Sequence, residues 1–272
     1  MSQAIDIAAL FNELSTDTAQ LQSLKKDGVL ILRINRPEQR NPLSLDVLNS
    51  LRKVLETEAR ANDIKLAIIT GAGDKSFAAG GDLKELMSVR SHEAAIDMSD
   101  QARHALDSIR RFPVPVIAAI NGDALGGGLE LAMACDFRIM SDTARVAFLQ
   151  GRLNLSTGWG GGTDSLNKLP ISTALELMCS REMLSGQRAL QLGLCNRVAS
   201  HTDLMESVSE FASPMLQQTV AVLRSFKAMA IAKARGDSRE QMLALETELF
   251  ADNWVHDDHW EAVDRVFTRG QR

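Results

Sequence analysis

Two glycine-rich segments constrain this chain more than any other feature, because each follows an apolar run of strand length and precedes a helical pattern. Residues 77–84 read Phe-Ala-Ala-Gly-Gly-Asp-Leu-Lys, and residues 124–130 read Ala-Leu-Gly-Gly-Gly-Leu-Glu. Glycine lets a backbone approach a ligand without an intervening Cβ, and a helix start offers unpaired N–H groups with partial positive charge. Two such helix starts predict an oxyanion hole, in which two backbone donors bind one developing negative oxygen.

Apolar runs and helical patterns alternate along most of the chain. Helices are expected from Ser44 onward, around 94–111 and up to residue 134, and strands are expected at 29–34, 66–70, 116–120, 137–140, 145–148 and 194–198. Such alternation argues for parallel strand–helix units rather than a β-sandwich or a helical bundle. The predicted fold class is therefore α/β.

The pattern changes near residue 200. Four helices are expected beyond it, at 204–211, 219–234, 240–250 and 260–266, with no further strand. We therefore divide the chain into a helical N-terminal extension (1–19), a core that carries the site (20–200) and a C-terminal helical region (201–272). Helices with exposed apolar faces need a partner, which the sheet body or a second subunit would supply.

Composition restricts the partners and the compartment. A net charge of -5 leaves no basic excess for a nucleic acid, and no apolar run approaches the roughly 20 residues of a membrane helix. The three cysteines lack metal-ligand or CxxC spacing, and the first 20 residues contain acidic side chains but no Lys or Arg. We expect a cytoplasmic protein that binds neither nucleic acid nor membrane.

The two glycine segments do not stand alone, since Asn35-Arg36-Pro37 precedes them and Ala-Cys-Asp-Phe-Arg follows at 134–138. With these motifs, residues 20–270 resemble the crotonase (enoyl-CoA hydratase/isomerase) superfamily. The resemblance implies a spiral of ββα units and a C-terminal helical region that packs homotrimers, often paired into dimers of trimers. It also implies an acyl-CoA substrate, with coenzyme A as part of the substrate and no separate cofactor.

The resemblance also implies roles for individual residues. It assigns the two oxyanion donors to the backbone N–H groups of Gly81 and Gly127. It assigns an acid/base role to Glu130, which lies three residues after Gly127 in the first turn of the helix expected there. Coenzyme A would lie bent across the first glycine segment, with Lys84 at one of its phosphates. The expected substrate-binding residues are Ala79, Asp82, Leu83, Lys84, Gly126, Arg152, Thr157 and Trp159.

The resemblance breaks where hydratases of this superfamily carry a second glutamate. Residues 148–162 contain no carboxylate, and the equivalent position falls on Arg152 or nearer Gln150, depending on whether it is counted from Phe148 or from the Gly-Trp-Gly turn. Hydration of an enoyl thioester requires a base for water and an acid for C2, work usually divided between two carboxylates. A standard hydratase is therefore not favoured.

Decarboxylation of a malonyl-type thioester requires neither base, because loss of CO₂ itself generates the enolate that an oxyanion hole stabilises. The turn Thr-Gly-Trp-Gly-Gly at 157–161 is similar to the branch that contains ethylmalonyl- and methylmalonyl-CoA decarboxylases. There Trp159 would line the acyl pocket or simply pack the loop, and Ser156 or Thr157 would orient a carboxylate. Arg152 would pair with that carboxylate or, as we prefer, face solvent.

We therefore predict an acyl-CoA lyase that decarboxylates a short malonyl-type substrate. The alternatives are an enoyl-CoA hydratase/isomerase with an unusual second acid/base, an acyl-CoA thioester hydrolase, and a non-catalytic CoA-binding protein. No metal site is expected, because His256 and His259 flank two aspartates on an expected helix without a visible third ligand. We interpret this stretch as a solvated acidic face.

Overall fold

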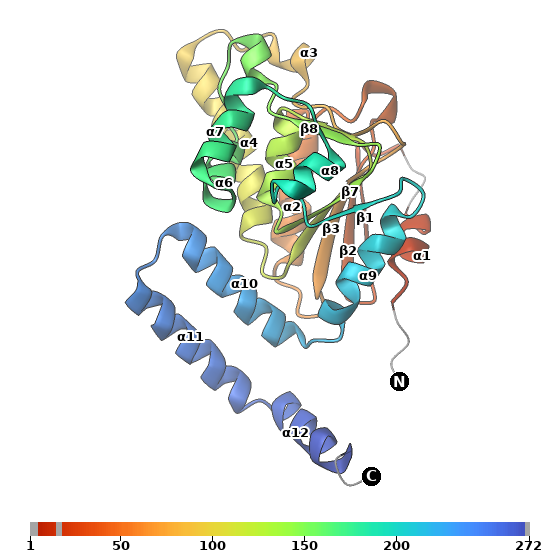
Figure 1. Cartoon of the computed structure of the whole chain (residues 1–272), viewed down its shortest axis with the longest axis vertical. Helices are drawn as coiled ribbons and strands as arrows, with labels where there is room; N and C mark the ends of the chain where they lie inside the picture. Colours follow the sequence, from red (N-terminus) through yellow and green to blue (C-terminus); the bar gives the residue numbers. More distant parts are fainter. Residues whose placement is uncertain (1–4, 15–17, 270–272) are drawn as a thin grey trace.

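The computed structural model describes residues 5–14 and 18–269 and contains two β-sheets surrounded by helices (Figure 1). The larger sheet has the order β1 (Leu21–Lys26), β2 (Val29–Ile34), β3 (Leu66–Gly71), β5 (Val116–Ile120), β7 (Phe137–Ser141) and β10 (Arg197–Ala199). β1 and β2 form an antiparallel hairpin, and the remaining neighbours are parallel. The smaller sheet has the order β4 (Ser76–Ala78), β6 (Asp123–Leu125), β8 (Arg145–Ala147) and β9 (Leu184–Ser185).

The helices are distributed along the whole chain. Those before residue 135 are α1 (Ile7–Asn12), α2 (Leu45–Glu58), α3 (Leu83–Leu86), α4 (His92–Arg110) and α5 (Gly127–Ala134), with the 3-10 turn η1 (Pro37–Gln39). Those after it are η2 (Gln150–Leu153), α6 (Gly161–Lys168), α7 (Ile171–Ser180), α8 (Gly186–Gln191), α9 (Leu204–Leu216), α10 (Val220–Arg235), α11 (Arg239–Trp254) and α12 (Asp257–Arg269).

The larger sheet is buried on both faces, as its continuous apolar strands require. Along β2, Leu30 and Leu32 face one hydrophobic cluster while Val29 and Ile31 face another, in the two-residue period of a strand. The first cluster includes side chains of α2, α4 and α5, and the second is closed by α1 and α9, which lie together against one face of the sheet (Figure 1). This double cover makes the sheet a rigid support for the loops at its edge.

The expected α/β class is confirmed, with three differences in detail. Each glycine segment follows a short strand of the smaller sheet, β4 or β6, whereas the sequence pattern had connected the second segment directly to the strand 116–120. The expected strand 194–198 is wrong in its bounds, since β10 covers only Arg197–Ala199. Helices α6, α7 and α8 fill the interval for which the sequence pattern predicted no element.

The four C-terminal helices form where they were expected, but only the first two pack closely on the body. α9 and α10 bury apolar side chains, whereas α11 buries none, and α11 and α12 extend away from the sheets (Figure 1). Within the described residues, none of the helices is both long and apolar enough to cross a membrane. The domain boundaries near 20 and 200 stay predictions.

A buried ion pair ties α10 to the larger sheet. The ammonium of Lys227, only 4% exposed, lies 2.5 Å from a carboxylate oxygen of Asp136, and Asp136 also accepts a hydrogen bond from the backbone N–H of Val116 at 2.8 Å. This contact joins the C-terminal helical region to the segment that follows α5.

We therefore expect Lys227→Met to destabilise the protein. Loss of one partner from a buried ion pair lowers the free energy of unfolding by about 3–5 kcal/mol. Because the Asp136 side chain is 25% exposed, water can solvate the unpaired carboxylate, and we expect a smaller loss of about 2 kcal/mol. Urea unfolding measures the change, with Lys233→Met on the exposed part of the same helix as the control. An unfolding midpoint equal to that of the wild type would show that the pair contributes nothing.

Candidate active site

The two glycine segments lie side by side, as an oxyanion hole requires. Gly80 and Gly126 both have positive φ, 106° and 54°, in a region that side chains disfavour. A Cβ on Gly80 would lie 3.2 Å from the carbonyl oxygen of Leu125 and 3.6 Å from the backbone nitrogen of Gly127. Positive φ at both glycines therefore allows the backbones of the two segments to approach each other directly.

The expected donors, Gly81 and Gly127, share one aromatic neighbour. In the part of the chain that the structure describes, neither backbone N–H donates a hydrogen bond to another protein atom. A Cβ on Gly81 would lie 3.2 Å from Cη2 of Trp159, and a Cβ on Gly127 would lie 2.8 Å from the same atom. The structure thus brings together the two glycines and the tryptophan that the sequence analysis singled out separately.

Glu130 is buried beside these donors and is held by three protein groups. Its side chain is almost inaccessible, with the residue 2% exposed. One carboxylate oxygen accepts hydrogen bonds from the backbone N–H groups of Trp159 and Gly161, each at 2.9 Å, and the other accepts one from Nε2 of Gln150 at 2.8 Å. The carboxylate therefore joins helix α5, the Gly-Trp-Gly turn and η2.

Two opposing effects act on the acidity of Glu130. Burial raises its pKa, and the hydrogen bonds from Gly161, Trp159 and Gln150 lower it, with burial the larger effect. The resulting pKa lies above the ordinary value, so the protonated acid is more populated than in an exposed glutamate. A buried carboxyl group with a raised pKa is suited to donate a proton.

Gln150 is the residue that faces Glu130 from η2. Of the two positions that the sequence left open, Arg152 is exposed and Gln150 hydrogen-bonds to Glu130, while the equivalence of either position to the second glutamate of hydratases stays a prediction. The other amide atom of Gln150, Oε1, is buried and has no hydrogen-bond partner among the described residues. An amide has no titratable proton at neutral pH, so Gln150 cannot act as a general base.

The remaining residues of the first glycine segment divide into paired and exposed side chains. The carboxylate of Asp82 lies 2.9 Å from Nη1 of Arg36 and caps α3 at the N–H of Lys84. Burial raises the pKa of Asp82, but the hydrogen bond and charge of Arg36 outweigh it and hold that pKa below its usual value. Leu83 and Lys84 are exposed.

The turn that carries Trp159 is held from its other side by α4. Nη2 of Arg110 donates to the carbonyl oxygen of Trp159 at 3.0 Å and pairs with Asp164 at 2.8 Å. The sequence analysis missed Arg110, because it lies 49 positions from Trp159 and no local motif connects them. Thr157 packs against the start of α6, where a Cβ on Gly162 would lie 2.3 Å from its hydroxyl oxygen.

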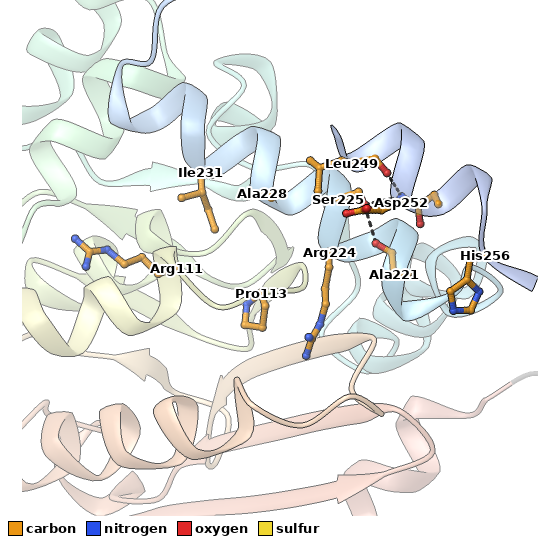
Figure 2. Close-up of a pocket in the computed structure, with 11 residues that line it drawn as sticks. Arg111, Pro113, Ala221, Arg224, Ser225, Ala228, Ile231, Leu249, Asp252 and His256 are labelled. Carbon is orange, nitrogen blue, oxygen red and sulfur yellow. Dashed lines mark hydrogen bonds between the residues drawn. The ribbon is translucent and has the colours of Figure 1, made fainter. Parts of the chain in front are cut away.

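A separate cavity lies away from the glycine segments. It measures about 420 Å³ and lies between α10, α11 and the segment after α4, with Arg111, Arg224 and His256 among its lining residues (Figure 2). None of the residues that line it is an expected site residue. Near this cavity, the ring of His259 packs against that of Trp254, with 4.7 Å between the ring centroids. The described residues contain no group of three or more His, Cys, Asp or Glu side chains that would hold a metal ion.

The contact between Gly127 and Trp159 is open to test through stability. A Cβ at position 127 would lie 2.4 Å from Cζ3 of Trp159, too close for the fixed indole. Overpacking of a core typically costs about 1–3 kcal/mol, and we expect Gly127→Ala to fall in this range.

Urea unfolding of Gly127→Ala should be compared with that of Gly193→Ala. At position 193 φ is positive, unlike at position 127, and a Cβ would meet nothing within 4 Å, so the loss expected there is backbone strain alone, about 1 kcal/mol. A Gly127→Ala variant as stable as the wild type would mean that Trp159 moves without cost.

Comparison with known proteins supports the family resemblance that the sequence motifs indicated. The sequence model of the enoyl-CoA hydratase/isomerase family matches residues 24–271. A short-chain-enoyl-CoA hydratase of Clostridium acetobutylicum is 32% identical over 88% of this chain and 92% of its own length, and an ethylmalonyl-CoA decarboxylase of Xenopus laevis is 27% identical over 85% and 78%.

Solved structures agree with the fold. The crystal structure of an enoyl-CoA hydratase from Polaromonas sp. superposes with a TM-score of 0.84 at 31% identity, covering 92% of this chain and 97% of its own. Fold, sequence and the paired glycine segments point the same way, and the chain belongs to the enoyl-CoA hydratase/isomerase family of the crotonase superfamily.

Proposed function

We propose that this acyl-CoA enzyme is a lyase that decarboxylates a short malonyl-type acyl-CoA through a thioester enolate. The observation that carries the proposal is the partner of Glu130, which is the amide of Gln150 rather than a second carboxylate. One carboxyl group is sufficient as the proton donor to an enolate. Hydration of a double bond normally uses a second such group, which this site lacks.

The proposed reaction uses the two glycine donors first. The bond between C2 and the substrate carboxylate breaks, its electron pair forms the C1–C2 double bond, and CO₂ leaves. The thioester oxygen becomes negative and binds the N–H groups of Gly81 and Gly127, an interaction for which loss of one donor costs about 3 kcal/mol. C2 then takes a proton from Glu130, which regains one from solvent.

The surface beside the donors favours the loss of charge from the reacting carboxylate. The indole of Trp159 contacts both donor glycines and is 7% exposed, while Arg152 faces solvent. A carboxylate placed against this ring loses hydration without gaining a counter-ion, and release of neutral CO₂ relieves that cost. Ser156 and Thr157 supply hydroxyl groups in the same turn, and their role in orienting the carboxylate stays a prediction.

A second candidate function is enoyl-CoA hydration or isomerisation, which the similarity to the hydratases of Clostridium acetobutylicum and Polaromonas sp. favours. The unpartnered Oε1 of Gln150 is an acceptor for one hydrogen of a water molecule, with Glu130 as the single acid/base. In hydrolysis of the thioester, the same water molecule would attack the carbonyl carbon instead of the double bond. A protein that binds acyl-CoA without turnover is the remaining alternative.

The coenzyme A subsite is proposed along the first glycine segment. The main chain of Ala79, Asp82 and Gly126 would border the thioester arm, and exposed Leu83 and Lys84 on α3 would contact the nucleotide end. The expected cytoplasmic location stays a prediction from the sequence.

A substrate panel tests the proposed function. We expect release of CO₂ from methylmalonyl- or ethylmalonyl-CoA to exceed hydration of crotonyl-CoA at least 100-fold, since only the former avoids a second carboxylate. CO₂ is measured by a coupled assay and hydration by loss of the conjugated absorbance. Fast crotonyl-CoA hydration without CO₂ release would exclude the decarboxylase.

Replacement of Gln150 separates the two candidates further. We expect Gln150→Glu to raise crotonyl-CoA hydration by about 100-fold, because it supplies the missing carboxylate next to Glu130. Glu130→Gln in the same chain should abolish the gain. Arg152→Glu is the matched control, since it places a carboxylate at the exposed alternative position, and a similar gain in this variant would contradict the role given to position 150.

We further propose that the C-terminal helices assemble the chain into a homotrimer or a dimer of trimers. α11 buries no side chain within its own chain, and the exposed apolar residues of α11, α12 and their connection include Phe250, Trp254, Val255, Trp260, Val266 and Phe267. An apolar area of this kind on a soluble chain marks an interface.

Light scattering tests the assembly. The wild type should elute with three or six times the mass of one chain, and the double variant Phe250→Asp/Val266→Asp should shift toward one chain because two charges would then lie in the interface. Arg239→Asp, at the start of α11, is the control for added negative charge. A monomeric wild type would overturn this proposal.

A further inference from the structure

We propose that Trp159 determines the length of the acyl group, so that the site accepts short acyl chains and rejects medium and long ones. This inference rests on the proposed acyl-CoA site, but it concerns binding and does not depend on which reaction follows. It gives a specific role to a residue that sequence analysis left between pocket lining and loop packing.

The position of the ring relative to the donors carries the inference. The benzene half of the indole faces both glycines, since Cζ2 and Cη2 lie 3.3 and 3.2 Å from a Cβ on Gly81, and Cζ3 and Cη2 lie 2.4 and 2.8 Å from a Cβ on Gly127. A thioester oxygen that binds both N–H groups must lie about 3 Å from each. Its acyl carbons then lie within a few bonds of this ring.

A second apolar side chain narrows the same space. Cδ1 of Leu86, at the end of α3, lies 3.0 Å from a Cβ on Gly81. Trp159 and Leu86 thus approach the first donor from two elements. Absence of a Cβ at both donor positions makes room for the indole, and the indole occupies space that an extended acyl chain would otherwise use.

The backbone that carries the ring is held in place by hydrogen bonds. The N–H of Trp159 donates to Glu130 and its carbonyl oxygen accepts from Arg110, which is fixed in turn by Asp164 and Asp107. These anchors lie on α5, α4 and α6, three elements of the packed body. These hydrogen bonds fix the backbone from which the indole projects, and close packing around this side chain, 7% exposed, restricts its rotamers, so the limit on chain length is built into the fold.

Binding of unreactive ketone analogues of acyl-CoA tests the inference without turnover, because a methylene replaces the thioester sulfur while the carbonyl oxygen stays available to both N–H groups. Titration calorimetry would compare the acetyl, butyryl and octanoyl analogues on the wild type and on Trp159→Phe, which keeps both backbone hydrogen bonds and removes the fused ring. Each buried methylene is worth about a fourfold gain in affinity. We expect the wild type to gain nothing from butyryl to octanoyl, and Trp159→Phe to bind the octanoyl analogue at least tenfold more tightly than the wild type.

The controls keep the outcome decisive. Ile171→Ala alters an exposed side chain at the start of α7 and should leave the binding of all three analogues unchanged. If Trp159→Phe melts at a much lower temperature than the wild type, Trp159→Leu is a second variant that removes the ring. Tighter binding of the octanoyl than of the butyryl analogue by the wild type, or unchanged affinities in both folded Trp159 variants, would overturn the inference.

Failure of the proposed decarboxylation gives a different result. If the wild type prefers short ketone analogues and Trp159→Phe accepts longer ones, but no malonyl-type substrate releases CO₂, the role of Trp159 stands and the proposed reaction falls. If CO₂ is released while the octanoyl analogue binds the wild type best, the reaction stands and the role of Trp159 falls.

Discussion

The buried carboxylate of Glu130 is the interaction on which the candidate site depends. A carboxyl group taken out of water is costly unless its oxygens are hydrogen-bonded, and here three N–H donors from two segments meet that need. Two of them, at Trp159 and Gly161, belong to the turn that begins α6, where a helix start favours a negative charge. One side chain thus fixes the distance between α5 and the turn, and with it the place of Trp159.

Glycines make this arrangement sterically possible. A Cβ on Gly128 would lie 1.9 Å from the carbonyl oxygen of Ala78, and one on Gly161 would lie 2.5 Å from Cγ of Glu130. Close packing and oxyanion binding can be regarded as rival explanations for such glycines, but the structure makes them compatible. The packing that excludes a Cβ also brings Gly81 and Gly127 together, with their N–H groups not bonded to any other described residue.

Family membership and site chemistry answer different questions about this protein. Membership in the enoyl-CoA hydratase/isomerase family makes it an acyl-CoA enzyme, because the paired backbone donors suit a thioester oxygen whatever happens to the enolate. The fate of the enolate depends on a few side chains around it. Here these are a carboxyl group, an amide and an indole, and the proposed decarboxylation rests on this combination.

Sequence alone determined the alternation of strands and helices, the α/β class, the family and the identity of the two glycine segments, because these depend on local periodicity and on motifs of adjacent residues. It also showed that no carboxylate lies between Phe148 and Trp159. Tertiary structure decided that Gln150 rather than Arg152 meets Glu130, that Arg110 holds the turn, and that Trp159 contacts both donors. These contacts join positions 20 to 78 residues apart, and only the packing of α5 against α4, α6 and β4 brings such positions within hydrogen-bond or van der Waals distance.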